Sequence, residues 1–179
     1  MNTQQNQCNL AIDMQRVWLE HVWWTRNVIL GIISDLPGNA QYTERLLQNP
    51  ADMANVFQPH IRNFPRQQFV ELFTTHLKQG GDIVTAAKAG NAALVAQLQL
   101  QWHANADQIA AMFANMSPCY SEDEVRRMMY EHLRLTTDEA TQNLNRQYTD
   151  EVRTFDAIQA EALEMANYFT NGIIRCNCN

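Results

Sequence analysis

Apolar residues recur every three or four positions along nearly the whole chain, which is the spacing of amphipathic helices. No segment alternates with the period of two that is typical of a half-buried strand. The pattern predicts long helices over residues 10–34, 65–88, 92–116 and 137–174, and shorter ones over 40–48, 50–60 and 121–135. Each long helix would span about 35 Å or more.

Capping signals set the boundaries of these helices. Asn49 followed by Pro50 predicts an N-cap and the first turn of a new helix. Thr136 with Glu139 forms a capping box, which predicts a break before the last helix. Four long helices joined by short loops predict an all-α fold, an antiparallel four-helix-bundle-like core with additional short helices.

The same boundaries predict one domain. Residues 1–9 are expected to form a flexible N-terminus, 10–174 a single helical domain, and 175–179 a Cys-containing tail. A tandem helical repeat is the alternative architecture, because Glu20-His21-Val22 with Thr25 resembles Glu131-His132-Leu133 with Thr136, and Thr75-His76-Leu77 is a partial third copy. The recurrence is too short and too irregular to predict a solenoid.

Three of the five histidines lie on the apolar stripes of their helices. At 100° per residue, His21 and His132 each lie about 10° from the centre of a stripe, and His76 about 20°. We therefore expect these imidazoles to point into the core. His21, His76 and Asn105 lie near the middle of their helices, as does Asp156 in the last helix, so antiparallel packing would bring them to one level.

A buried imidazole without hydrogen bonds costs about 1–3 kcal/mol, so each of these histidines needs a partner. Two interpretations of the layer provide such partners, and both remain open. In the first, His21, His76 and His132 bind a transition metal (Zn, Fe, Ni or Cu) or a small ligand, with Asn105 or Asp156 as oxygen donors. In the second, the layer is purely structural and the protein is a non-catalytic interaction module. No Glu-x-x-His motif occurs, which disfavours a ferritin-type di-iron site, and no residue pattern identifies a catalytic group or a substrate.

Two other groups of side chains are expected on the outer faces of their helices. His103 and Asp107 are four residues apart, but they lie about 135° and 175° from the centre of their stripe, so we expect a surface pair rather than a metal site. Trp23 falls on the outer side of the first helix, which favours cover by a short helix or by a second subunit in a homodimer.

Charge and cysteine content narrow the function classes. The 179 residues include 13 Lys and Arg against 19 Asp and Glu, and a net charge of −6 disfavours nucleic-acid and anionic-membrane partners. The absence of a signal peptide and of a long apolar run predicts a soluble, cytoplasmic protein. The four cysteines, Cys8, Cys119, Cys176 and Cys178, are expected to be reduced thiols; alternatively, Cys8 meets the tail in a disulfide or a soft-metal site.

Several stretches between residues 18 and 167 resemble a family of short, mainly bacterial all-α proteins that has no established activity. The matching stretches are Glu20–Arg26, Arg45–Asp52, Ala86–Gly90, Asn105–Ala110, Tyr130–Leu133 and Ala162–Ala166. Members sometimes carry an acetylglutamate kinase label. This chain has neither a Gly-rich phosphate loop nor an α/β pattern, so we reject that activity for it.

Overall fold

The computed structural model describes residues 3–177. This range contains six α-helices, one short 3-10 helix and no strand, which confirms the all-α prediction. The elements are α1 (Thr3–Ile33), α2 (Asn39–Phe57), η1 (Gln58–His60), α3 (Arg66–Lys88), α4 (Ala92–Met116), α5 (Glu122–Leu144) and α6 (Tyr148–Asn177).

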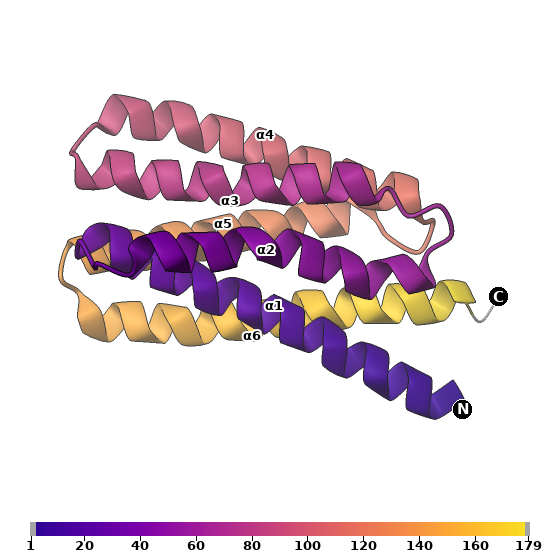
Figure 1. Ribbon diagram of the computed structural model, residues 1–179. Coiled ribbons are helices and arrows are strands. Elements are labelled where there is room, and N and C mark those ends of the chain that lie inside the picture. Colours follow the sequence, from indigo (N-terminus) through magenta and orange to yellow (C-terminus); the bar gives the residue numbers. More distant parts are fainter. Residues whose placement is uncertain (1–2, 178–179) are drawn as a thin grey trace.

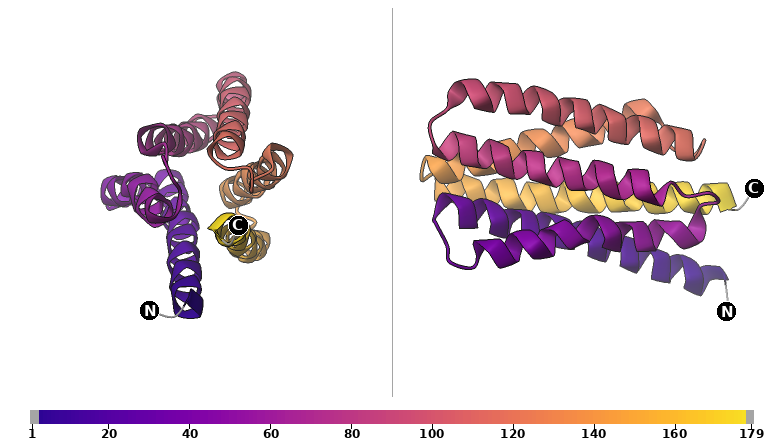
Figure 2. Two further views of the ribbon diagram at one scale, coloured as in Figure 1. Left: turned by 90° about the vertical axis from the view of Figure 1, so that its right-hand side faces the viewer. Right: turned by 45° about the horizontal axis from the view of Figure 1, so that its top comes forward.

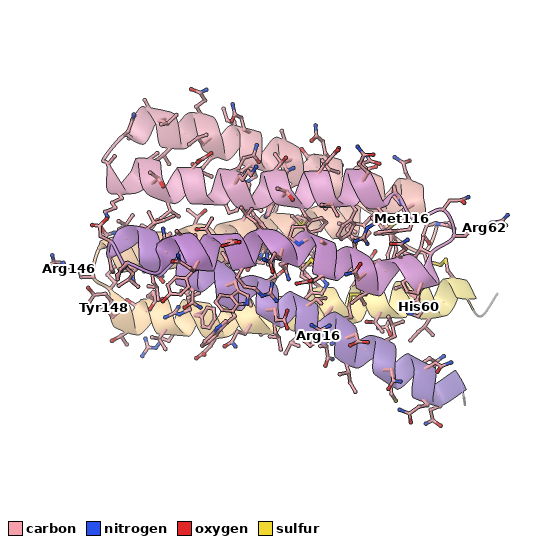
Figure 3. All side chains as sticks on the ribbon, viewed as in Figure 1. Arg16, His60, Arg62, Met116, Arg146 and Tyr148 are labelled. Atoms are coloured by element: carbon pink, nitrogen blue, oxygen red, sulfur yellow. A yellow bond between two sulfur atoms is a disulfide. The ribbon has the colours of Figure 1, made fainter. Side chains whose placement is uncertain are left out.

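The helices form an up-and-down bundle in which consecutive helices are antiparallel neighbours. Both chain ends lie at one end of the bundle (Figure 1). Arg146 and Tyr148, at the α5–α6 turn, lie at the opposite end from His60 and Met116 (Figure 3). Helix α6 also packs along α1, which closes the bundle, and α1 reaches both α3 and α5. The end-on view in Figure 2 shows three helical hairpins, α1–α2, α3–α4 and α5–α6, around a common axis.

The predicted short helices are parts of longer ones. Helix α2 continues through Pro50, and its N-cap is Gly38 rather than Asn49. An interior proline removes one helical hydrogen bond. The buried face of α2, which includes Leu46, Met53 and Phe57, keeps the helix continuous against the rest of the bundle.

The predicted break at Thr136 is also wrong. Helix α5 continues to Leu144, and the turn lies at residues 145–147, where Arg146 adopts a positive φ of 59°. The Thr136 hydroxyl donates to the carbonyl of His132 within the helix, at 2.8 Å. A threonine can bond in this way inside a helix as well as at a cap, so the capping-box pattern did not distinguish the two.

The outer boundaries of the helical domain differ from those expected. Helix α1 includes residues 3–9, expected as a flexible segment, and α6 includes residues 175–177, expected as part of the tail. Within residues 3–177 no helix combines the length and the apolar character that crossing a membrane requires.

Aromatic side chains fill one half of the core. Five phenylalanines from α2, α3, α4 and α6 are buried and in mutual ring contact: Phe57, Phe69, Phe73, Phe113 and Phe169. The Trp18 ring stacks on Phe169 with a centroid distance of 5.4 Å and so extends this cluster along α1. Side chains fill the space between the helices along the whole bundle (Figure 3).

A disulfide joins Cys119, in the α4–α5 loop, to Cys176, in the last turn of α6. The expectation that Cys119 and Cys176 are reduced thiols is therefore wrong, and so is a disulfide between Cys8 and Cys176. Cys8 is exposed and free, and Cys178 lies outside the described residues. Arg175 donates to the carbonyl of Cys119 at 3.1 Å beside the bond. The end of α6 is therefore attached to the loop that precedes α5.

We expect replacement of both Cys119 and Cys176 by serine to lower the free energy of unfolding by about 2–4 kcal/mol, because the bond restricts the unfolded chain. Urea unfolding measures this change. Cys8→Ser, at an exposed free thiol, is the control and should leave stability unchanged. Peptide mapping without reductant should find the 119–176 link; rapid alkylation of Cys119 in native protein would contradict it.

Candidate metal centre

Three histidines from the odd-numbered helices meet inside the bundle. His21 of α1, His76 of α3 and His132 of α5 are each at most 3% exposed, which confirms that they point into the core. The His132 ring lies between the other two, with centroid distances of 5.5 Å to His21 and 5.9 Å to His76. We call these three residues the histidine cluster.

Each histidine of the cluster faces an oxygen on the helix that follows it. His21 Nδ1 lies 3.1 Å from Asn49 Oδ1 of α2, and His76 Nδ1 lies 3.0 Å from Asn105 Oδ1 of α4. His132 Nδ1 lies 3.3 Å from Glu161 Oε2 of α6. The partner follows its histidine by 28 residues in the first hairpin and by 29 in the second. All three hairpins thus contribute one imidazole and one oxygen to the same layer.

The two asparagines fix the tautomers of their histidines. Asn49 Nδ2 donates to the carbonyl of Val17 at 2.9 Å, and Asn105 Nδ2 donates to the carbonyl of Leu72 at 3.1 Å. A carbonyl can only accept, so these bonds orient each amide with Oδ1 toward the imidazole. Nδ1 of each ring must therefore carry the proton. Nε2 of His21 and of His76 is left with a lone pair.

The lone pair of His76 has no partner among the described residues. His76 Nε2 is fully buried and makes no hydrogen bond there, although the His76 carbonyl accepts from Trp102 Nε1 at 3.0 Å. A buried polar atom left unpaired costs about 1–3 kcal/mol. A buried atom of this kind is satisfied by a water molecule, an ion or another ligand.

Burial keeps two of the imidazoles neutral. It lowers the pKa of His21 to about 3, with the charge of His132 acting in the same direction and the hydrogen bond that His21 donates to Asn49 opposing it. Burial also lowers the pKa of His76 well below its usual value, reinforced by His132 and His21 and opposed by Asn105. The neutral imidazole is the form that binds metals, so both rings are ready as ligands at neutral pH.

A small cavity adjoins the histidine cluster. Its volume is about 30 Å³, and all three imidazoles line it together with Thr25, Thr136 and a surround that is mostly apolar. A volume of this size holds one ion or one or two water molecules. Pockets for organic ligands are roughly 300 Å³ or more. The cavity is therefore much smaller than a typical pocket for an organic ligand.

The oxygen donors differ from those predicted. Asp156 is exposed on α6 and lies outside the layer. The sequence pattern places Asp156 in the middle of a last helix that begins at residue 137. Because α6 begins at Tyr148, the middle of this helix lies near Glu161 instead. Asn105 lies in the layer, but its amide oxygen faces His76 Nδ1 and its nitrogen bonds Leu72. It therefore orients a histidine and does not face the cavity.

Two members of the layer were missed from the sequence. Asn49 is fully buried, but its position before Pro50 is typical of a cap. Glu161 is nine-tenths buried, and neither of its carboxylate oxygens has a hydrogen bond that the geometry supports. Their spacing along the chain could have identified both residues, because Asn49 follows His21 by 28 residues and Glu161 follows His132 by 29. Within the described residues, no group of three or more His, Cys, Asp or Glu side chains is arranged so that it could hold a metal ion.

A buried ion cluster lies one to two helical turns from the histidines. Arg26 of α1 contacts the carboxylates of Glu139 and Glu151, which are 1% and 3% exposed. Burial raises the pKa of Glu139 to about 7, against the opposing effect of Arg26. The Arg26 guanidinium also lies over the Phe155 ring, 4.3 Å from its centroid. Arg26 therefore links α1 to both helices of the third hairpin.

The surface pair behaves as expected. Asp107 accepts from Arg126 Nε and from the Tyr130 hydroxyl, each at 3.0 Å, while His103 Nδ1 lies 2.8 Å from the carbonyl of Gln99. Arg126 and Tyr130 belong to α5, so Asp107 joins α4 to α5, whereas the partner of His103 lies in α4 itself. They lie outside the cavity-lining set.

Comparison with known protein families, with functionally characterised proteins and with solved structures finds no match to this chain. The resemblance to a bacterial all-α family therefore stays a prediction. The functional proposal therefore rests on the geometry of the histidine cluster.

We expect the metal-free protein to lose stability as the pH falls below about 6.5, because the buried histidines must gain a charge. Their folded pKa values are depressed, so their stabilising contribution is present above pH 6.5 and is lost toward pH 3. Each histidine contributes about 1.4 kcal/mol per pH unit in this range. His21→Gln should therefore reduce the slope between pH 6 and pH 5 by about that amount.

Urea unfolding at pH 7, 6 and 5 measures this slope. Glu139 acts in the opposite sense, since its raised pKa stabilises below pH 4.5 and that contribution is lost as the pH rises through 7. Because Glu139 is present in both proteins, its contribution cancels when the pH slope of His21→Gln is compared with that of the wild type. Equal slopes for the two proteins would show that His21 is not held neutral.

Proposed function

We propose that the histidine cluster binds one divalent transition-metal ion through Nε2 of His21, His76 and His132. The observation that carries this proposal is the buried, unpartnered lone pair of His76 Nε2 beside a cavity that the other two imidazoles also line. In metal sites the second ring nitrogen of a ligand histidine donates to a carboxylate or to a carbonyl oxygen. Asn49, Asn105 and Glu161 provide such oxygens here.

The spacing of the rings supports a shared ion. For metal–nitrogen bonds of about 2.1 Å at a tetrahedral angle, the ring centroids would lie about 5.2 Å apart. The distances from His132 to His21 and to His76, 5.5 and 5.9 Å, are within about 1 Å of that value, while His21 and His76 lie on opposite sides of His132. Binding of one ion by all three rings would therefore require the side chains of His21 and His76 to move toward each other. The ion completes the site that the apo side chains leave slightly open.

The donor set indicates the type of metal. Three neutral nitrogens suit Zn, Fe, Ni or Cu, whereas Mg and Ca prefer oxygen ligands. A dinuclear carboxylate site of the ferritin type does not fit, because Glu161 faces Nδ1 of His132 rather than the cavity. Three protein ligands leave a fourth position for water or a small ligand, as in catalytic rather than structural metal sites.

His21→Ala should abolish metal binding, because it removes one of three protein ligands. Elemental analysis of protein purified without a histidine tag should find about one ion per wild-type chain and almost none in the variant. Added metal should raise the melting temperature of the wild type alone. His21→Gln, which keeps a polar side chain, provides a second ligand-deficient protein if the alanine variant folds poorly.

His103→Ala is the matched control, since it removes a histidine that lies outside the cavity. It should keep the metal content and the thermal shift of the wild type. A wild-type protein that takes up no transition metal and gains no stability from any of the four would overturn the proposal. The cluster would then be a structural polar layer.

A different observation supports a second role, that of an interaction module. Trp23 of α1 is 54% exposed, and Val152 of the neighbouring α6 is 52% exposed. The Trp23 ring contacts Phe155 at one edge, with a centroid distance of 6.3 Å. An exposed tryptophan beside an apolar neighbour is typical of a protein interface. We propose that this face pairs two copies of the chain in a homodimer.

Sedimentation over a wide range of protein concentrations tests this role. We expect a concentration-dependent dimer that Trp23→Ser weakens, because the substitution removes the largest exposed apolar side chain of the face. Leu100→Ser is the control, since Leu100 is 75% exposed on α4, away from Trp23. A monomer at every concentration would exclude the homodimer.

A further inference from the structure

A cleft lies between the N-terminal half of α1 and the segment formed by α2 and η1. Its volume is about 660 Å³, and one face of α1 lines it, with Asn6, Leu10, Asp13 and Arg16 at helical spacings of three and four. Figure 1 shows α1 slanting away from α2 toward the N-terminus. Figure 3 labels Arg16 and His60, one from each side of the cleft. We call this space the polar cleft.

Ion pairs join the two helices at the end of the polar cleft that lies toward the middle of the bundle. Arg45 of α2 donates to Glu20 of α1 at 2.9 Å and to Asp52 of its own helix at 3.1 Å. Arg16 of α1 donates to the same Glu20 at 3.1 Å. These contacts connect α1 to α2, and they leave both guanidinium groups of the cleft already paired with carboxylates.

The polar cleft has an apolar floor and a polar rim. Leu10 is buried in the core and Val56 packs against the core, half-buried. The amides of Asn6, Asn9 and Asn55 are exposed around them. Neither Asn6 nor Asn55 has a side-chain hydrogen bond to another of the described residues. Because each amide offers both a donor and an acceptor, the rim matches a ligand that has both.

The charges of the cleft select against an ionic ligand. Asp13 and Asp52 balance Arg16 and Arg45, and Glu20 pairs with both arginines. An anion would be repelled by the two aspartates, and a polycation by the two guanidinium groups. A wholly apolar ligand would leave the polar groups of the rim without partners. An uncharged molecule with many hydroxyl groups and an apolar face avoids all three penalties.

We propose that the polar cleft binds an uncharged carbohydrate of the size of a mono- or disaccharide. Each sugar hydroxyl both donates and accepts, which matches amide, carboxylate and guanidinium groups. The C–H face of a sugar ring would pack on Leu10 and Val56, while its hydroxyls bond Asn9, Asn55 and Asp13. The volume of the cleft lies in the range of pockets for small organic ligands, roughly 300–1,000 Å³.

This site is independent of the proposed metal site. Among the described residues, the polar cleft and the cavity beside the histidine cluster share no lining residue. Sugar binding therefore needs no metal, and metal-free protein tests it. The two proposals can fail separately.

NMR titration of the metal-free protein with glucose, galactose, N-acetylglucosamine, maltose and trehalose tests the proposal. We expect at least one of these sugars to bind with a Kd of about 1 mM or tighter and to shift the backbone amide signals of Asn9 and Asn55. Its affinity should be the same in about 0.05 M and about 0.5 M NaCl, because salt does not screen an uncharged ligand. Citrate and spermidine are the charged comparisons. No binding of any sugar at about 20 mM, or tighter binding of citrate or spermidine, would overturn the proposal.

Asn55→Trp should weaken binding of the same sugar at least about tenfold, because the indole would occupy the space over the apolar floor. Asn55 is exposed, so the variant is expected to fold, and its melting temperature checks this. Asn9→Ala, which removes one amide of the rim, is a second variant and should weaken binding several-fold. Asn115→Trp is the matched control, since it changes an exposed asparagine of α4 outside the cleft. It should bind the sugar like the wild type. Unchanged affinity in Asn55→Trp and Asn9→Ala would overturn the polar cleft as the sugar site.

Discussion

A buried neutral imidazole must place its N–H on an acceptor, and this requirement sets the relative position of the helices within each hairpin. Asn49 and Asn105 can accept from His21 and His76 only at one register of α1 against α2 and of α3 against α4. The carbonyls of Val17 and Leu72 hold the amides in turn. Once both hairpins have this register, the remaining ring nitrogens face the bundle interior at one height.

The third hairpin differs, because His132 Nδ1 lies 3.3 Å from Glu161 Oε2 without a hydrogen bond between them. Glu161 takes the place that asparagine has in the other two, and Arg26 with Glu139 and Glu151 adds a buried ion cluster one to two turns away. The three imidazoles therefore differ in the side chain that faces Nδ1, which is an amide at His21 and His76 and a carboxylate at His132. If the cluster binds the proposed ion, the carboxylate would increase the basicity of His132 more than an amide does.

The sequence allowed a good prediction of the fold class and of the buried histidines, because both depend on the helical period. The stripe angles placed His21, His76 and His132 in the core, where they lie. The predicted helix boundaries were wrong where a short sequence pattern occurs both at helix starts and inside helices. Asn49-Pro50 and Thr136 with Glu139 are typical of helix starts, but tertiary packing places both pairs inside continuous helices. The error at Thr136 shifted the centre of the last helix and directed attention to Asp156 instead of Glu161. The pairing of Cys119 with Cys176 depends on how loops and helix ends meet in space, which no periodicity reports.

The three histidines of the cluster are distributed over three hairpins, so the cluster forms only when the hairpins associate. His21 and His132 are 111 residues apart in the chain, so no short fragment contains the complete set. In a zinc finger, the ion organises a short segment as it binds. Here the hairpins must associate before the three imidazoles meet, so the proposed ion would enter a cavity that already exists. Any ligand of the cluster would thus be acquired after folding, whereas the Cys119–Cys176 bond, which joins a loop to a helix end, is of a kind that forms in oxidising surroundings.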